Sequence, residues 1–92
     1  MGIPVSLKGH QHICPLDKHI GGPIQDGDPT LTVNGIAVAL VGHRCECQKD
    51  SPDVITGGTP LLTVNGIAVA LVGSPTAHGG KVIEGDATLT IG

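Results

Sequence analysis

The chain has 92 residues and a net charge of −3, and it contains no Phe, Tyr or Trp. Only five Lys and Arg residues are present, so it offers neither the basic surface nor the stacking side chains of a nucleic-acid-binding protein, and we expect no nucleic acid partner. With 15 Gly and 7 Pro among many Val, Ile and Thr, the composition favours tightly turned β-structure over helices. We also expect no signal peptide and no membrane span, because no apolar run reaches roughly 18–20 residues.

The chain begins with half of a segment that it later repeats in full. Residues 2–9 read GIPVSLKG and share five of eight positions with residues 35–42. The full segment, LTVNGIAVALVG, occupies residues 31–42 and recurs without a mismatch at 62–73. Each copy has Asn-Gly at its centre. Asn-Gly between β-branched runs predicts a hairpin with a type I′ turn, because both turn positions need positive φ.

The chain ends with the other half of this segment. Residues 85–91 read GDATLTI and match residues 27–33 at five of seven positions. We therefore predict one all-β domain over residues 1–92, built from three pseudo-threefold repeats in which the third hairpin is open at the chain ends. Strand 3–8 then pairs with strand 87–91 and closes the fold, which removes exposed sheet edges. The predicted repeats are residues 2–34, 35–65 and 66–92.

Three long loops follow the repeated strands and leave from the same end of the predicted domain. They are residues 9–26, 42–57 and 73–84. Counted from the glycine that ends each strand, only the fifth position is a strong metal-ligand residue type in all three loops, namely Cys14, Cys47 and His78. Threefold symmetry brings these side chains together at one end of the axis. His19 supplies a fourth ligand, which completes a Cys₂His₂ set typical of tetrahedral zinc, with iron as the alternative metal.

Other ligand sets remain open at this stage. His12 and Cys45 occupy the third position of their loops and are alternative ligands, because Cys45 and Cys47 are close enough in sequence to exchange roles. A disulfide from Cys14 to Cys45 or to Cys47 is the alternative to a metal in an oxidising compartment. The first loop positions are expected to be ordinary solvated residues of a turn, and they are His10, His43 and Ser74.

The sequence favours a structural site over a catalytic one. Four protein ligands leave no open coordination position, and neither Glu46 nor Glu84 lies in a zinc-hydrolase motif. A protease dyad of Cys14 and His19 would lack an evident oxyanion device and a substrate cleft. We therefore expect no enzymatic activity, and zinc would add folding free energy to a core without aromatic residues.

Several motifs together resemble the PAAR-repeat proteins. They are the Val-Asn-Gly hairpins at 33–35 and 64–66 with the Leu-Thr before them, and the loops Cys14-Pro15…His19 and Thr76-Ala77-His78-Gly79-Gly80. The resemblance covers nearly the whole chain. It departs from the family where the Pro-Ala-Ala-Arg stretch falls on PVSL at residues 4–7 and on AVAL at 37–40 and 68–71. It departs again where the family's usual Asp, after the glycine that ends each strand, is replaced by His or Ser.

The resemblance implies a small β-cone with zinc near its sharp vertex, held by Cys14, His19, Cys47 and His78. Its base is expected to cap the trimeric VgrG-type spike of a bacterial type VI secretion machine and to sharpen it for membrane puncture. A separate effector is a further expected partner, and the target membrane is contacted only during puncture. Such a protein is made in the bacterial cytoplasm and secreted through the machine. The alternative is a free-standing metal-binding module, suggested by three Cys and five His in so short a chain.

Overall fold

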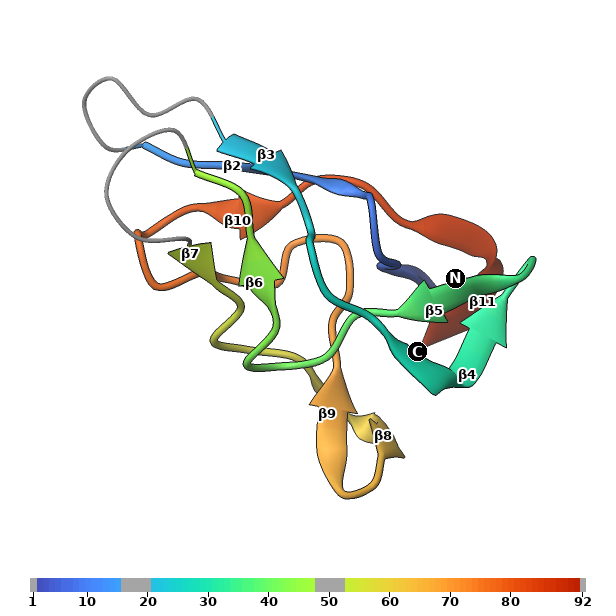
Figure 1. The fold of residues 1–92 in the computed structure, drawn as a ribbon. Helices are drawn as coiled ribbons and strands as arrows, with labels where there is room; N and C mark the ends of the chain where they lie inside the picture. Colours follow the sequence, from blue (N-terminus) through green and yellow to red (C-terminus); the bar gives the residue numbers. More distant parts are fainter. Residues whose placement is uncertain (1, 16–20, 48–52, 92) are drawn as a thin grey trace.

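The computed structural model describes residues 2–15, 21–47 and 53–91, and Figure 1 shows the path of the chain. In these residues the chain forms short strands and no helix, so the expected all-β class is confirmed. The strands are β1 (Ile3–Val5), β2 (Gln11–Ile13), β3 (Gly21–Pro23), β4 (Asp28–Val33), β5 (Ile36–Val38), β6 (Arg44–Cys45), β7 (Asp53–Val54), β8 (Thr59–Val64), β9 (Ile67–Val69), β10 (Lys81–Val82) and β11 (Asp86–Ile91). The described part of the chain contains no helix that is long and apolar enough to cross a membrane.

The two copies of the repeated segment form the expected hairpins. β4 pairs with β5, and β8 pairs with β9, both in antiparallel register. At the turns, Asn34 and Asn65 have a φ of 52°, and the glycines that follow, Gly35 and Gly66, have φ of 80° and 81°. Positive φ at both turn positions is what a type I′ turn requires, so the backbone conformation explains the choice of Asn-Gly.

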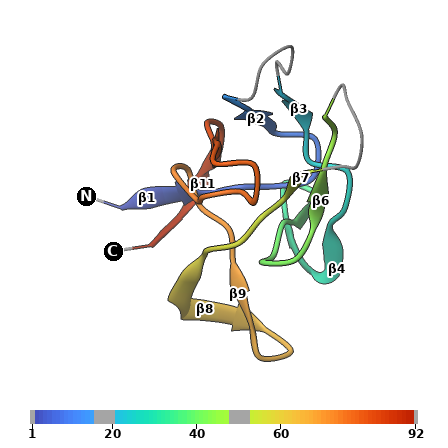
Figure 2. The same cartoon turned by 90° about the vertical axis from the view of Figure 1, so that its left-hand side faces the viewer.

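The first and last strands of the chain pair with each other. β1 lies antiparallel to β11, with Ile3 opposite Ile91 and Pro4 opposite Thr90. Figure 2 shows the two ends of the chain side by side. The prediction that terminal strands close the fold is confirmed, and this third strand pair is open where the other two have an Asn-Gly turn.

A closed cycle of three backbone hydrogen bonds joins the repeated strands. Ser6 N–H donates to Ala70 O at 2.9 Å, Ala70 N–H donates to Ala39 O at 2.9 Å, and Ala39 N–H donates to Ser6 O at 3.0 Å. These residues occupy the same position in the repeat, and all three are fully buried. Backbones that approach this closely favour small side chains, which explains why small residues alternate with bulky ones in the repeated strand.

The buried apolar residues of the repeats form two clusters. The first joins the hairpins and contains Val5, Leu7, Val33, Val38, Leu40, Val64 and Val69. The second joins the loop segments and contains Ile24, Ala39, Cys45, Ile55, Ala70 and Val82. Both clusters draw equivalent residues from different parts of the chain. Each segment therefore buries apolar surface that it could not bury alone.

The three loops contain more regular structure than the sequence indicated. β2 pairs with β3 in the first loop and with β10 in the third, which gives the sheet order β10-β2-β3. β6 pairs with β7 in the second loop. Figure 1 places these five strands at one end of the molecule and the hairpins at the other. Backbone pairing therefore positions the side chains of the loop end.

Candidate metal centre

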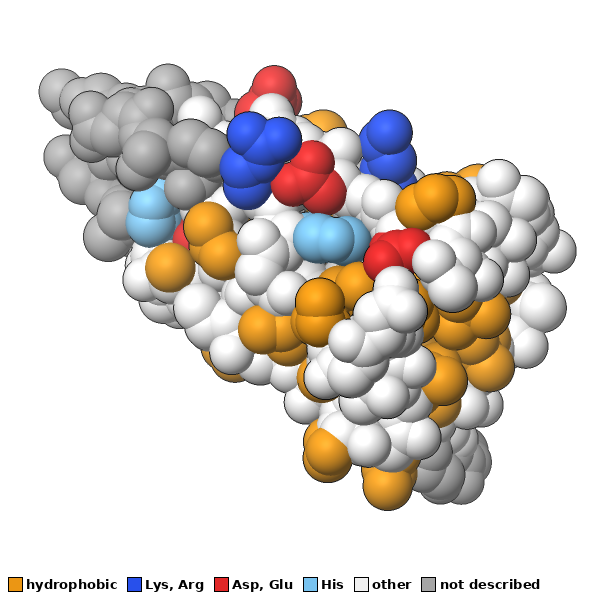
Figure 3. All heavy atoms as spheres, turned by 60° about the horizontal axis from the view of Figure 1, so that its bottom comes forward, with side chains coloured by type: hydrophobic (Ala, Val, Ile, Leu, Met, Phe, Trp, Pro, Cys, Tyr) orange, Lys and Arg blue, Asp and Glu red, His pale blue; other side chains and the backbone are white. Residues whose placement is uncertain are grey.

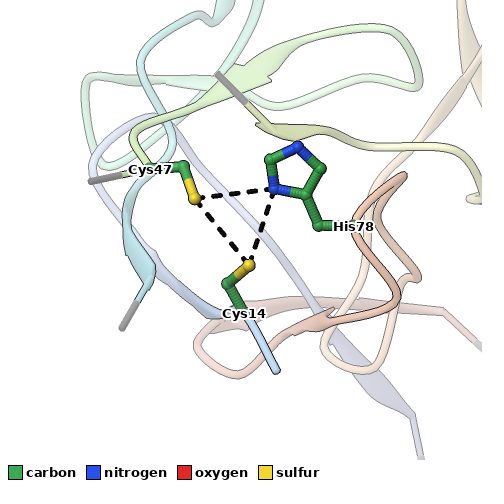
Figure 4. Close-up of side chains that lie close together, drawn as sticks. All are labelled: Cys14, Cys47 and His78. Carbon is green, nitrogen blue, oxygen red and sulfur yellow. Dashed lines mark hydrogen bonds between the residues drawn. The ribbon is translucent and has the colours of Figure 1, made fainter. Parts of the chain in front are cut away.

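Three side chains from separate loop segments converge at the loop end of the molecule. Cys14 follows β2, Cys47 lies shortly after β6, and His78 precedes β10. Figure 4 shows the two sulfurs and the imidazole facing one another. The sulfurs are 3.7 Å apart, and each lies 3.5 Å from His78 Nδ1. Among the described residues, this is the group of His, Cys, Asp and Glu whose ligand atoms all lie within 4.8 Å of one another, and we call it the metal centre.

These separations match a tetrahedral zinc site. Bonds of about 2.3 Å to sulfur and about 2.0–2.1 Å to nitrogen, at tetrahedral angles, separate two sulfurs by about 3.8 Å and a sulfur from a nitrogen by about 3.5–3.6 Å. Thiolates and imidazole are also the donor types found in structural zinc sites. Spacing and chemistry therefore fit a metal ion. The predicted fourth ligand, His19, lies outside the described residues.

The PAAR motif, as a family model, matches residues 17–84, which is 68 of the 92 residues. The chain belongs to the PAAR-motif family. No curated protein sequence matches it. Membership confirms the resemblance seen in the hairpins and loops. It makes the chain a module of the spike-tip type, from a structural rather than an enzymatic family, with a candidate metal centre.

In this PAAR-motif protein, the loops leave their strands by the same turn. The glycine that ends each strand has a φ of 94°, and its N–H donates to the carbonyl of a buried Ile or Val further along the same loop, at 2.7–2.9 Å. The donor and acceptor pairs are Gly9 and Ile24, Gly42 and Ile55, and Gly73 and Val82. Identical turns give each loop the same starting direction, so the fifth residue after each glycine reaches the same place.

The residue after each of these glycines closes the turn. His10 Nδ1, His43 Nδ1 and Ser74 Oγ each accept the backbone N–H of the leucine three residues earlier, at 2.9, 3.1 and 2.8 Å. The expectation that the two histidines are simply solvated is therefore corrected. Their ring nitrogen replaces the serine oxygen as a hydrogen-bond acceptor, which explains how His and Ser occupy equivalent positions.

The alternative ligands from the third loop positions lie elsewhere. Burial raises the pKa of the Cys45 thiol to about 12, and the negative charges of Asp53 and Asp26 add to this effect. Since zinc binds the thiolate, a thiol that stays protonated is a poor ligand. Cys45 instead packs in the apolar cluster of the loop segments. His12, the other alternative ligand, is buried and turned toward Asp53.

Neither disulfide alternative fits the described geometry. The Cys14 and Cys47 sulfurs are 3.7 Å apart, well beyond the S–S bond length of about 2.05 Å. Cys45 is a free thiol within an apolar cluster. The sulfurs of Cys14 and Cys47 are therefore close neighbours and not a bonded pair.

A buried carboxylate beside the metal centre escaped the sequence analysis. Asp53 is fully buried, and its Oδ2 lies 3.2 Å from His12 Nε2. Its Oδ1 accepts the backbone N–H groups of His78 and Val54, each at 2.9 Å. On the far side of the imidazole, His12 Nδ1 lies 2.8 Å from Gly22 O and must donate, because a carbonyl oxygen only accepts.

The hydrogen bonds of Asp53 offset the cost of its burial. Burial by itself raises the pKa of this carboxyl, but the nearby Thr76 hydroxyl and the hydrogen bonds from the His78 and Val54 amides outweigh it, and the pKa is lowered. Asp53 is therefore ionised beside the metal centre. The sequence carried one trace of this role, since Asp53 is a charged residue at a buried position that is glycine, Gly22 or Gly80, in the other two loops, but that trace does not by itself assign a function.

Proposed function

We propose that this protein is a structural, zinc-stabilised tip that caps the trimeric VgrG-type spike of a type VI secretion machine and sharpens it for membrane puncture. The observation that carries the proposal is a set of three exposed isoleucines at equivalent positions of the hairpins. Ile3, Ile36 and Ile67 are 47%, 44% and 44% exposed. They lie on β1, β5 and β9, at the end of the molecule away from the metal centre.

Three equivalent apolar side chains suit a partner that presents three identical surfaces, as a trimer does. Each isoleucine gains free energy by leaving water, at about 25 cal/mol per Å² of apolar surface buried. Figure 3 shows hydrophobic side chains gathered over the hairpin end, whereas most charged side chains visible on that face lie between the two ends. The hairpin end is therefore the docking base in this proposal, and the loop end is the point.

Zinc is the metal in this proposal, held by Cys14, Cys47 and His78 with His19 as the fourth ligand. The separations between the donor atoms of these three described ligands support zinc. A closed shell of four protein ligands adds folding free energy and has no open position for catalysis. Because the ligands come from different loops, the ion would cross-link the point of a small protein that lacks aromatic core residues.

The remaining parts of the proposal concern where the tip acts. It is made in the bacterial cytoplasm and leaves the cell through the injection machine. A separate effector is its further partner, and it meets the target membrane only during puncture. These parts rest on membership of the PAAR-motif family together with the geometry of the two ends.

Co-purification with the cognate spike trimer tests the docking base. Ile36→Asp places a charge in the proposed interface, so we expect it to abolish co-purification while the circular dichroism spectrum stays unchanged. Ile83→Asp is the matched control, because Ile83 is 46% exposed but follows β10 at the loop end. Equal binding by both variants would contradict the proposed base.

Metal exchange separates the spike tip from a free-standing metal-binding module. A tip that depends on zinc should release the ion slowly and unfold when a chelator removes it. A module that buffers or carries metal should exchange zinc rapidly and stay folded afterwards. Isotope exchange of bound zinc and thermal unfolding with and without chelator measure both properties. Rapid exchange with an intact metal-free fold would favour the module.

A further inference from the structure

Asp53 is linked to each of the three chain segments that carry the described ligands of the metal centre. Its Oδ1 accepts the N–H of His78 itself. Its Oδ2 faces His12, which lies on β2. Cys14 directly follows this strand, two residues after His12. Its backbone is paired with Cys45 across β6 and β7, and Cys45 lies two residues before Cys47. One buried residue of the second loop is therefore tied to all three segments that supply ligands.

We propose that Asp53 is a positioning residue of the metal centre, which holds the Cys14 and His78 segments in register through its carboxylate while its backbone pairs with the segment of Cys47. The inference rests on the proposal that Cys14, Cys47 and His78 bind zinc. It assigns Asp53 no direct bond to the metal, because its Oδ1 accepts backbone N–H groups and its Oδ2 faces His12 at 3.2 Å.

The action of Asp53 on His78 runs through the backbone. In many zinc sites a carboxylate binds the second nitrogen of the ligand imidazole. Here Asp53 Oδ1 instead accepts the main-chain N–H of His78, and it lies 3.9 Å from Nδ1, the nitrogen that faces the sulfurs. The carboxylate therefore fixes where the His78 Cα lies and leaves Nδ1 directed at the sulfurs.

The His12 contact completes the tie on the side of Cys14. His12 is held between Gly22 O and Asp53 Oδ2, so its imidazole spans the space between the first and second loops. Both side chains of the pair are fully buried, so removing either one leaves a buried polar group facing an empty space. Loss of Asp53 would therefore displace β2, and with it Cys14, as well as the His78 segment.

Zinc affinity of Asp53 variants tests the inference. Asp53→Ala removes every carboxylate contact, and we expect zinc affinity, measured by competition with a chromogenic chelator, to fall about 10- to 100-fold, as is usual for outer-sphere changes. Asp53→Asn should recover most of the loss. Its amide oxygen can still accept the His78 N–H, and its amide N–H can donate to His12 Nε2.

A cobalt(II) spectrum distinguishes positioning from general loss of structure. At saturation, each variant should keep the charge-transfer intensity of two thiolates and a tetrahedral d–d spectrum, with only the affinity reduced. Asp26→Asn is the matched control, because Asp26 also accepts a backbone N–H from a neighbouring loop, but its side chain is partly exposed and does not belong to the metal centre. It should leave zinc affinity within about twofold.

The outcomes distinguish a failure of the positioning role from a failure of the proposed metal site. Wild-type protein with less than about half an equivalent of zinc would overturn both. Wild-type protein that binds zinc, with unchanged affinity in Asp53→Ala, would overturn the positioning role alone. If Asp53→Ala does not fold, His12→Asn decides, since it keeps a donor for Gly22 but cannot reach Asp53. An affinity equal to wild type in that variant would overturn the inference, and a reduced affinity with an unchanged cobalt spectrum would support it.

Discussion

Arg44 donates three hydrogen bonds to Asp26, two from its guanidinium and one from its backbone N–H, at 3.0–3.2 Å. The pair joins the first loop to the second. At the equivalent junction between the third and first loops, Glu84 Oε1 accepts the Gln11 N–H at 2.8 Å. A carboxylate from one loop therefore caps the backbone of the next at two of the three junctions.

Acid should weaken the first of these junctions. Hydrogen bonds from Arg44 hold the pKa of Asp26 at about 2, below its usual value of about 3.8. Because the folded-state pKa is the lower one, the stabilisation is fully present above about pH 4 and is lost as the pH falls toward 2. At pH 6 we expect the free energy of unfolding of the wild-type protein to exceed that of Asp26→Asn by no more than about 1 kcal/mol, since the pair of Asp26 and Arg44 is exposed.

The difference in Tm between the two proteins should shrink between pH 4 and pH 2. Loss of metal in acid affects both proteins alike, so the difference between them isolates Asp26. A difference that stays constant over this range would show that the carboxylate charge contributes nothing to the junction.

The third junction lacks both partners of this arrangement. Gly57 replaces the carboxylate, and Pro75 replaces the residue whose N–H would be capped. A Cβ at Gly57 would lie 2.8 Å and 2.9 Å from Pro75 Cγ and Cδ, closer than side chains normally approach. The two residues are therefore matched to each other.

A double-mutant cycle at this junction should reveal the match. We expect Gly57→Ala alone to destabilise the protein by about 1–3 kcal/mol through overpacking. In the Pro75→Ala background the clash is gone, so Gly57→Ala should be nearly neutral and the coupling should exceed about 1 kcal/mol. Chemical denaturation of the four proteins measures it, and additive effects would rule out the clash.

The hydrogen bond that closes each turn predicts the order of stability of wild-type protein, His43→Ser and His43→Ala. In His43→Ala, the Leu40 N–H loses its acceptor in a part-buried turn, which should cost about 1–2 kcal/mol. His43→Ser should recover at least half of that loss, because Ser74 makes the same bond in the third loop at 2.8 Å. Thermal unfolding of the three proteins gives the order, and equal destabilisation by Ala and Ser would show that the imidazole acts by packing instead.

The repeat made most of the fold predictable. Exact recurrence around Asn34 and Asn65 fixed the hairpins, and the half-segments at the two ends predicted the pairing of β1 with β11. The same counting brought Cys14, Cys47 and His78 together, because threefold equivalence converts a position in the sequence into a position in space. Features carried by the same residue type in all three repeats were therefore accessible from the sequence.

Features that differ in residue type between the repeats were not accessible. Asp53 stands where the other loops have glycine, so no comparison between repeats assigned it a role. The pairing of β10 with β2 joins segments almost seventy residues apart through short strands with little alternation, and no periodic pattern marks it. His10 and His43 differ from Ser74 in residue type, which obscured their common role as acceptors.

The two cysteines of the second loop should respond differently to the same substitution. Cys47 Sγ lies in the metal centre, so Cys47→Ser should lower zinc affinity by more than the about 10- to 100-fold expected for outer-sphere residues. Cys45 is fully buried among apolar side chains, and its Sγ is not among the donor atoms of the metal centre. Cys45→Ser should therefore keep one equivalent of zinc but lose about 1–3 kcal/mol of stability, because it buries a hydroxyl without a partner.

Zinc content by elemental analysis and unfolding in denaturant separate the two effects, with Cys45→Ala as the control that removes the sulfur without adding a polar group. Loss of zinc from Cys45→Ser and its retention in Cys47→Ser would move the metal centre by two residues and contradict the arrangement described above.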